Sequence, residues 1–284
     1  MFVKFFKRTF IILTFLIISG CSIVSVGYNR LPLLAIVELD SIFDLSDEQD
    51  NLARIELDAW LQWHRGAHLP LYIAKLEQWE KLVLQDLTPA QFCKEVEVIR
   101  TLTNEAVEKF IPALIPIAQT LTPKQIEKWN KYQEERDKEF IENFRVGEKG
   151  EIINEKRLKR AIERAEMLYG NLSKNQKDAL AKRLEKSVFT AEQVLPERKR
   201  RHQDALTAVN LIQSGAKPYP TLKAVWDRNQ KSPSTNYEVY SEKMLQDGCS
   251  QLSEVHNNTT LEQRQKAAQK LNGYRKDFEG LIKP

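Results

Sequence analysis

Apolar residues recur every three or four positions along most of this chain, which is the period of one face of an α-helix. A clear example is the series Phe92, Val96, Ile99, Leu102, Ala106 and Phe110. The chain has only ten glycines, and long stretches are rich in Glu, Lys, Gln, Ala and Leu, which favour helix. No segment alternates as a strand would. We therefore predict an all-α fold, an elongated multi-helix bundle of about seven to nine helices.

The helices begin at a repeated signal, Leu-[Ser/Thr]-x-x-Gln. It occurs at residues 45–49, 87–91, 121–125 and 172–176, and Thr260–Gln263 is a fifth copy without the leucine. Each copy is a capping box, in which the hydroxyl accepts a backbone N–H and the glutamine side chain reaches back to the N–H of the capping residue. The copies are too unevenly spaced for a solenoid. They predict successive helix starts within one bundle.

Proline and glycine predict the interruptions. We expect Pro112 and Pro116 to break the helix near Phe110, and one helix from Asn175 to about Gln213 to bend at Pro196. The helical domain would cover residues 35–284, with a possible subdomain break near 145–153 and a loose Pro-rich segment at 217–234.

The start of the chain reads as an export signal. Lys4, Lys7 and Arg8 precede the apolar run Phe10–Ile18, with no acidic residue among the first ten. A run of nine residues is too short to span a bilayer, which needs roughly 20 apolar residues. We therefore predict that residues 1–20 form a cleaved signal peptide.

The four residues Ile18, Ser19, Gly20 and Cys21 resemble the bacterial lipobox. The resemblance implies cleavage before Cys21 and acylation of its thiol, with residues 21–34 forming the lipidated N-terminus and a short tether. Ser22, in place of Asp, implies the outer membrane, with the domain facing the periplasm. The alternative is a secreted protein in which Cys21 merely follows an ordinary cleavage site.

Charge excludes one class of partner. Without the three basic residues of the signal peptide, 40 Lys and Arg face 39 Asp and Glu, so we expect no nucleic acid. Basic clusters at 198–201 and 156–164 are either solvated helix faces or contacts to anionic lipid headgroups.

Two cysteines remain besides Cys21. In an exported chain an even pair indicates a disulfide, so Cys93 and Cys249 are predicted to be bonded, with two buried free thiols as the alternative.

His64 and His68 have the spacing that places two imidazoles on one helix face, as in some metal sites. Gly66 and Pro70 weaken that helix, and polar contacts at a helix end are the alternative. The sequence contains no recognisable catalytic motif, so we predict no enzymatic activity and no cofactor.

Several segments resemble an uncharacterised family of proteobacterial helical lipoproteins. They are residues 27–32 (GYNRLP), Trp60–His64, the Leu-Thr-Pro caps and the run from Cys249 through His256 to Arg264. That family implies no known activity. The Leu-Thr-x-x-Gln motif is also similar to that of the Spy and CpxP periplasmic stress proteins, which shield unfolded clients.

Two functional hypotheses follow. The first is a non-enzymatic envelope lipoprotein that binds membrane lipid through acylated Cys21 and an unidentified envelope protein, with a chaperone as one version. The second is a metal-dependent protein that uses His64 and His68.

Overall fold

The structure, a computed structural model, describes residues 23–144, 146 and 155–282 of the 284-residue chain. The expected signal peptide and the lipobox lie outside the described residues. The described part is all-α, as predicted. The helices are α2 (Ile23–Asn29), α3 (Leu31–Phe43), α4 (Asp47–Trp63), the π-helical turn η2 (His64–His68), α5 (Leu69–Leu82), α6 (Pro89–Thr120), α7 (Pro123–Phe144), α8 (Glu155–Tyr169), α9 (Lys174–Glu185), α10 (Ala191–Gln213), α11 (Pro218–Gln230), α12 (Thr235–Asn257) and α13 (Leu261–Ile282).

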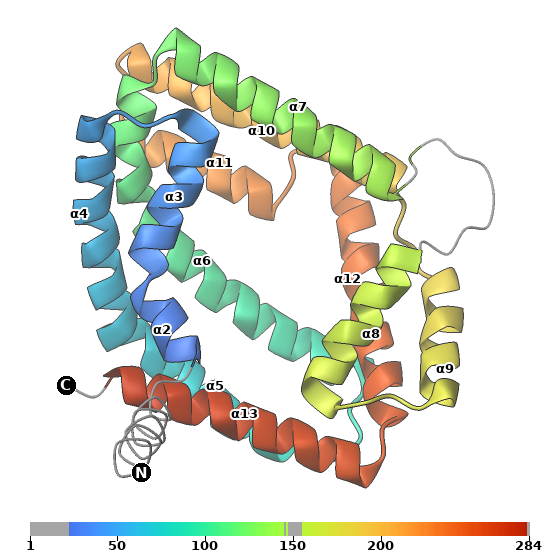
Figure 1. Ribbon diagram of the computed structural model, residues 1–284. Helices are drawn as coiled ribbons and strands as arrows, with labels where there is room; N and C mark the ends of the chain where they lie inside the picture. The colour runs from blue at the N-terminus through green and yellow to red at the C-terminus, as the bar shows by residue number, and fades with distance from the viewer. Residues whose placement is uncertain (1–22, 145, 147–154, 283–284) are drawn as a thin grey trace, which may run out of the picture.

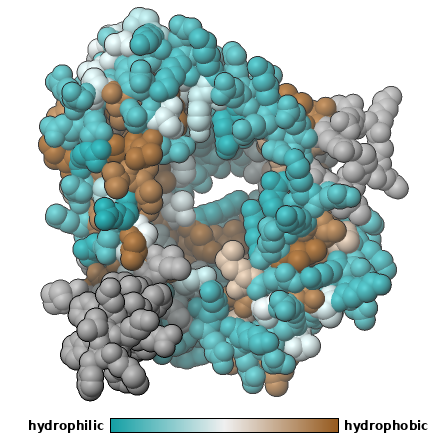
Figure 2. Space-filling model, viewed as in Figure 1, coloured by the Kyte–Doolittle hydropathy of each residue, from teal (hydrophilic) through white to brown (hydrophobic). Residues whose placement is uncertain are grey.

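These helices form a closed frame rather than the elongated bundle expected from the sequence. In Figure 1, α3 and α4 make the left side, α7 and α10 the top, α8, α9 and α12 the right side, and α5 with α13 the bottom. The long helix α6 runs across from α4 to α12. Figure 2 shows an opening through the frame. Periodicity shows that one face of each helix is buried, but it does not identify the partner helix, so the frame was not predictable.

All five predicted capping boxes are present. Ser46, Thr88 and Ser173 each accept the backbone N–H of the glutamine three residues on, and that glutamine accepts the N–H of the cap. Thr122 and Thr260 make the same two bonds. Each helix start is therefore encoded locally, as the sequence predicted.

The number of helices and several predicted interruptions are wrong. The described residues contain more helices than the expected seven to nine. Pro112 and Pro116 lie inside α6, because Ile111 and Ile117 beside them are almost fully buried and offset the lost backbone bonds. The chain instead breaks between α9 and α10, ahead of Pro196. There the N–H of Thr190 bonds the Tyr240 hydroxyl, so a tertiary contact replaces a helical one.

Two segments expected to be irregular are helical. The segment at 217–234 contains α11, whose Pro218 and Pro220 lie in the first turn, where a missing N–H costs nothing. The tether expected at 21–34 is helical from Ile23 onward. Tyr28 is buried against Leu69 and Leu281, which provides the burial that orders α2.

The largest hydrophobic core lies where α3, α4, α6 and α10 meet. Its buried members are Ile36, Ala53, Leu57, Ala113, Ile117, Ala118, Leu121, Val209 and Ile212. Among the described helices, none is both long enough and apolar enough to cross a bilayer. Ile36 of α3 belongs to the largest core and Tyr28 of α2 is buried against Leu69 and Leu281, so the N-terminal helices are packed parts of the frame.

Candidate functional site

The first described helix lies next to the residues that sequence analysis singled out. Helix α2 starts two residues after Cys21, and its Tyr28 packs with Leu69 of α5 and Leu281 of α13. The Tyr28 hydroxyl lies 2.8 Å from Nδ1 of His64. The start of the chain, one predicted histidine and the end of α13 therefore meet in one cluster.

The two histidines lie in the widened turn η2, between α4 and α5. Pro70 has no N–H to donate to the carbonyl of Gly66, and its ring would clash with that carbonyl in a regular helix. The chain instead closes a π-type bond from the N–H of Leu69 to the carbonyl of His64. Such turns are frequent at functional sites. Here the turn places both imidazoles in the interior, with ring centroids 5.1 Å apart.

His64 is held as a neutral base. Burial, and next the neighbouring His68, lower the pKa of His64 to about 4. Burial also raises the pKa of Tyr28 to about 12, so its hydroxyl keeps its proton and can donate to His64. Because Nδ1 of His64 is used in this contact, it is not free to ligate a metal. This contact corresponds to the polar alternative considered for the histidine pair.

His68 is almost fully buried and stacks on Trp63, with 4.9 Å between ring centroids. Its Nε2 lies 3.3 Å from a carboxylate oxygen of Glu105, but neither ring nitrogen makes a hydrogen bond of good geometry. Within the part of the chain that the structure describes, no three His, Cys, Asp or Glu side chains are grouped to hold a metal ion.

An exposed apolar face runs along α2 and α3. Its members are Val26, Leu33, Leu34 and Val37, whose exposed fractions are 53%, 42%, 54% and 58%. Apolar atoms also gather over α3 on the face seen in Figure 2. We call these four residues the N-terminal apolar face.

Four of the capping-box glutamines form two pairs, each between two helix starts that lie side by side. Gln49 and Gln125 exchange hydrogen bonds with each other, and so do Gln176 and Gln263. The first pair lines a pocket of about 430 Å³. Gln176 of the second pair lines one of about 270 Å³. The motif thus starts a helix and, in four of its five copies, joins that start to another one.

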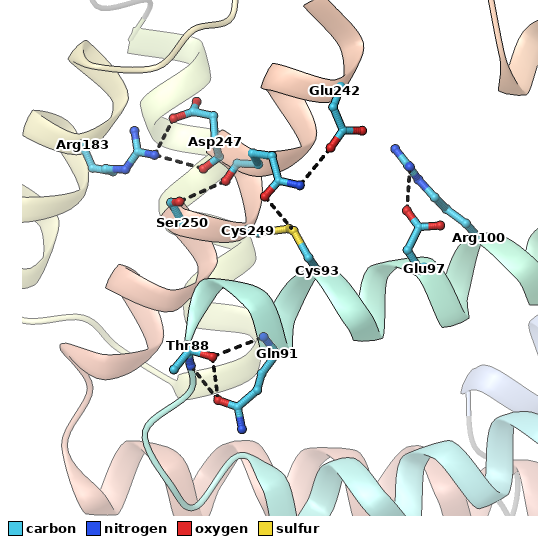
Figure 3. Close-up of a disulfide and its surroundings, with 11 residues drawn as sticks. Thr88, Gln91, Cys93, Glu97, Arg100, Arg183, Glu242, Asp247, Cys249 and Ser250 are labelled. Carbon is cyan, nitrogen blue, oxygen red and sulfur yellow. Dashed lines mark hydrogen bonds and ion pairs between the residues drawn. A yellow bond between two sulfur atoms is a disulfide. The ribbon is translucent and has the colours of Figure 1, made fainter. Parts of the chain in front are cut away.

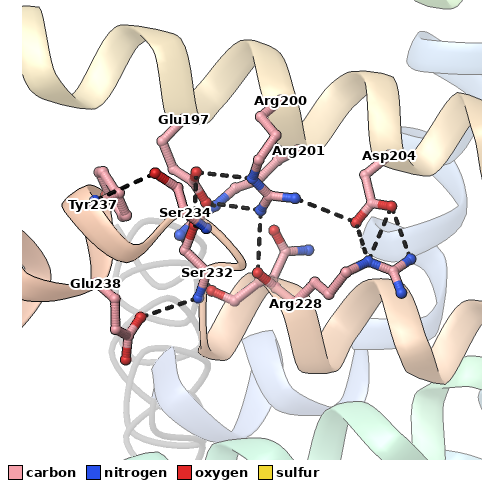
Figure 4. Close-up of polar contacts among 10 residues, drawn as sticks. Glu197, Arg200, Arg201, Asp204, Arg228, Ser232, Ser234, Tyr237 and Glu238 are labelled. Carbon is pink, nitrogen blue, oxygen red and sulfur yellow. Dashed lines mark hydrogen bonds and ion pairs between the residues drawn. The ribbon is translucent and has the colours of Figure 1, made fainter.

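The basic residues at 198–201 are largely used within the fold. Arg200 and Arg201 both bond Glu197 (Figure 4). Arg198 pairs with Asp137 of α7. Burial alone would raise the pKa of Glu197, but hydrogen bonds from these two arginines and Ser232 lower it below its usual value. These contacts tie α10 to α7 and to the start of α12.

The basic residues at 156–164 are partly engaged as well. Arg157 bonds the Ser187 hydroxyl at 2.6 Å, and the Arg160 guanidinium lies 5.6 Å from the centre of the Phe144 ring. These two arginines link α8 to the loop before α10 and to α7. For both clusters the ion pairs and packing agree better with a structural role than with contact to headgroups.

Cys93 of α6 and Cys249 of α12 form a disulfide, as the sequence predicted, with Cα atoms 5.4 Å apart (Figure 3). Beside it, Arg183 of α9 pairs with Asp247 of α12. One and two turns after Cys249 along α12, Ser253 and Asn257 hydrogen-bond the backbone of Leu87. The contact between α6 and α12 is therefore held by a covalent bond and by side-chain hydrogen bonds.

The described residues define an all-helical protein with a closed frame. Residues 41–237 match a family model described as a family of unknown function, DUF6279, and the chain belongs to that family. No curated protein and no solved structure matches the chain.

Sequence reasoning missed the aromatic partners of the histidines. Tyr28 and Tyr169 each contact a buried histidine, His64 and His256, across 36 and 87 residues of sequence. The local sequence shows only that each tyrosine lies shortly before a helix break. It does not indicate which histidine the tyrosine contacts. Sequence analysis noted His256 only within a run of similarity, although it is fully buried.

Proposed function

We propose that this protein is a lipid-anchored lipoprotein of the bacterial envelope, with acylated Cys21 in the outer membrane and the helical frame facing the periplasm. Its role is non-enzymatic: it binds another envelope protein or supports the envelope at the membrane surface. The proposal rests on the lipobox residues 18–21 and on the position of α2.

The single observation that carries it is the short distance in sequence between Cys21 and the folded frame. Helix α2 begins at Ile23, and Tyr28 within it is buried against α5 and α13. Two residues span about 7 Å at most. An anchor on Cys21 would therefore hold the frame directly at the membrane, whereas a long linker would allow the frame to move some distance from the membrane surface.

The binding role is supported by the surface of the frame. Apolar atoms over α6 border the opening seen in Figure 2, and large apolar side chains such as Ile99 of α6 and Leu252 of α12 are about half exposed. Exposed apolar surface of this kind is typical of protein contact sites.

The anchor is tested by expressing the full chain in a Gram-negative host and measuring its intact mass. We expect the mass of residues 21–284 plus a diacylglyceryl group and an N-linked acyl chain, and recovery in the outer-membrane fraction. The control is Cys21→Ser, which should carry no lipid. A wild-type chain that is exported and cleaved without acylation would contradict the proposal.

The partner is tested by crosslinking intact envelopes that contain the lipidated protein. We expect one defined envelope protein, identified by mass spectrometry, that rebinds after separate purification. A chain that crosslinks only to lipid and to abundant proteins in proportion to their amounts would argue for a supporting role instead.

A further inference from the structure

The N-terminal apolar face is one continuous surface. Leu33 and Val37 are four residues apart and lie on one side of α3, with Leu34 beside them, and Val26 is exposed on α2 seven residues before Leu33. Only Arg30 separates α2 from α3: its N–H bonds the carbonyl of Gly27 at the end of α2, and its carbonyl accepts the N–H of Leu34 in the first turn of α3. Tyr28 and Ile36 point the other way and are buried. The two short helices therefore present one exposed apolar side.

The polarity of this side changes along α3. The segment Leu31–Val37 contains no charged residue, whereas Glu38 and Asp40 follow directly. Glu38 accepts a hydrogen bond from Tyr132 of α7, so the far end of α3 is fixed in a polar setting. The apolar surface is thus confined to the end of the two helices nearest Cys21.

The position of the proposed lipid anchor indicates what covers the N-terminal apolar face. Helix α2 starts two residues after Cys21, and at 1.5 Å per residue Val26 and Val37 lie about 5 and 21 Å along the helices from Ile23. Acyl chains on Cys21 would hold this stretch at the headgroup layer. Apolar side chains of an interfacial helix enter a bilayer by roughly 5–10 Å, within reach of such a helix.

We propose that the N-terminal apolar face lies in the lipid interface and, together with acylated Cys21, fixes the orientation of the helical frame on the membrane. This inference rests on the proposed lipid anchor. Arg30 lies between the two helices and is exposed, so its guanidinium can reach lipid phosphates while the neighbouring apolar side chains enter the bilayer. One acylated residue attaches a protein, and a second contact is needed to orient it.

The test uses the acylated full chain in vesicles of phosphatidylethanolamine and phosphatidylglycerol. Val37→Cys and, separately, Leu34→Cys carry a nitroxide label. Cys21 is acylated and Cys93 and Cys249 are bonded, so the new thiol is the one that reacts, and the mass confirms a single label. The matched control is Val239→Cys on α12, where the native valine is exposed to a similar extent, 53%. Collisions of each label with oxygen, which enters lipid, and with a water-soluble nickel chelate are compared.

We expect the ratio of oxygen to nickel collisions at positions 34 and 37 to exceed the ratio at 239 at least several-fold. Equal ratios would overturn the inference. A label at 37 shielded from both reagents, with broadening by a second label, would show that another copy of the chain covers the face, and this would also overturn it.

Failure of the anchor is distinguishable from failure of the apolar face. If the wild-type chain carries no acyl group and does not float with vesicles, the proposed function fails and the inference fails with it. If the chain is acylated and floats while the label at 37 reports water, the anchor stands and the contact of α2 and α3 with lipid is wrong.

Discussion

Two buried histidines are each hydrogen-bonded to a tyrosine, but the two sites differ in the other partner of the imidazole ring. His256 lies 2.9 Å from the Tyr169 hydroxyl through Nδ1 and 2.7 Å from the carbonyl of Gln85 through Nε2. A carbonyl only accepts, so Nε2 carries the proton and Nδ1 receives the tyrosine. His64 has the matching contact from Tyr28. Its neighbour is the buried His68 instead of a backbone acceptor.

We call the two sites the disulfide cluster (Tyr169, His256, Cys93, Cys249) and the N-terminal cluster (Tyr28, His64, His68). The first joins helices that are also linked covalently, whereas the second holds α2, the helix next to the proposed anchor. The comparison predicts that the α6–α12 contact resists local opening more strongly than the N-terminal cluster does.

Removing the disulfide has the largest expected effect. Its loop spans 156 residues, for which the chain-entropy model gives a loss of about 5 kcal/mol as an upper figure. We expect Cys93→Ala with Cys249→Ala to lower the free energy of unfolding by about 3–5 kcal/mol, measured by urea titration. Wild-type protein under reductant should shift similarly. An unchanged midpoint in both would place the main stability outside the α6–α12 contact.

Replacing each histidine by leucine tests whether the second hydrogen bond of His256 contributes to stability. His256→Leu leaves the Tyr169 hydroxyl and the Gln85 carbonyl unpaired, and each buried unpaired group costs about 1–3 kcal/mol. His64→Leu leaves one such group, the Tyr28 hydroxyl. We expect losses of about 3 and about 1–2 kcal/mol, from urea titrations at neutral pH. Equal losses would mean that the second bond of His256 contributes nothing.

The contrast between these clusters also shows what the sequence could predict. Capping boxes such as Ser46 with Gln49 involve residues three apart, so their bonds follow from the local sequence. The pairing of Gln49 with Gln125 depends on the path of the chain over 76 residues, and nothing in either motif specifies it. The helix starts were therefore predictable and the frame was not.

The same distinction applies to the candidate site. The spacing of Cys93 and Cys249 in the sequence does not show that the two residues are close in space. The disulfide was predicted because two remaining cysteines in an exported chain favour one. His64 and His68 were identified from their spacing. Tyr28 was not, because burial of α2 against α13 brings together residues from opposite ends of the chain. The exposure of Val37 was equally hidden, since periodicity does not say which apolar side is covered.

Acid should destabilise the N-terminal cluster through protonation of His64. The pKa of His64 is about 4 in the fold and about 6.5 when unfolded, so the unfolded state binds more protons between these values. Stability from this group is complete above pH about 6.5 and falls as the pH drops towards about 4, by at most about 3 kcal/mol. The titratable side chains that lie against His64 are those of Tyr28, His68 and Tyr72.

The measurement is the urea midpoint of wild type and of His64→Leu at several values of pH. The wild type should lose more stability on acidification than the variant, because leucine does not titrate. Burial also lowers the pKa of His202 and of His256, and this background is common to both proteins. Parallel pH curves would show that His64 is not the group that responds.

The smallest effect comes from removing one hydroxyl from each cluster. Tyr28→Phe and Tyr169→Phe each delete a hydrogen bond to an imidazole nitrogen, at a cost of about 1 kcal/mol. Global stability should therefore barely separate the two variants, but amide hydrogen exchange should. Because Tyr28 holds a seven-residue helix that has little other burial, we expect faster exchange confined to α2 and the start of α3 in Tyr28→Phe. In Tyr169→Phe the disulfide and the Gln85 bond still hold α12, so α8 alone should exchange slightly faster. Uniform exchange changes across both variants would mean that the frame opens as one unit and that the N-terminal helices are not independently loosened.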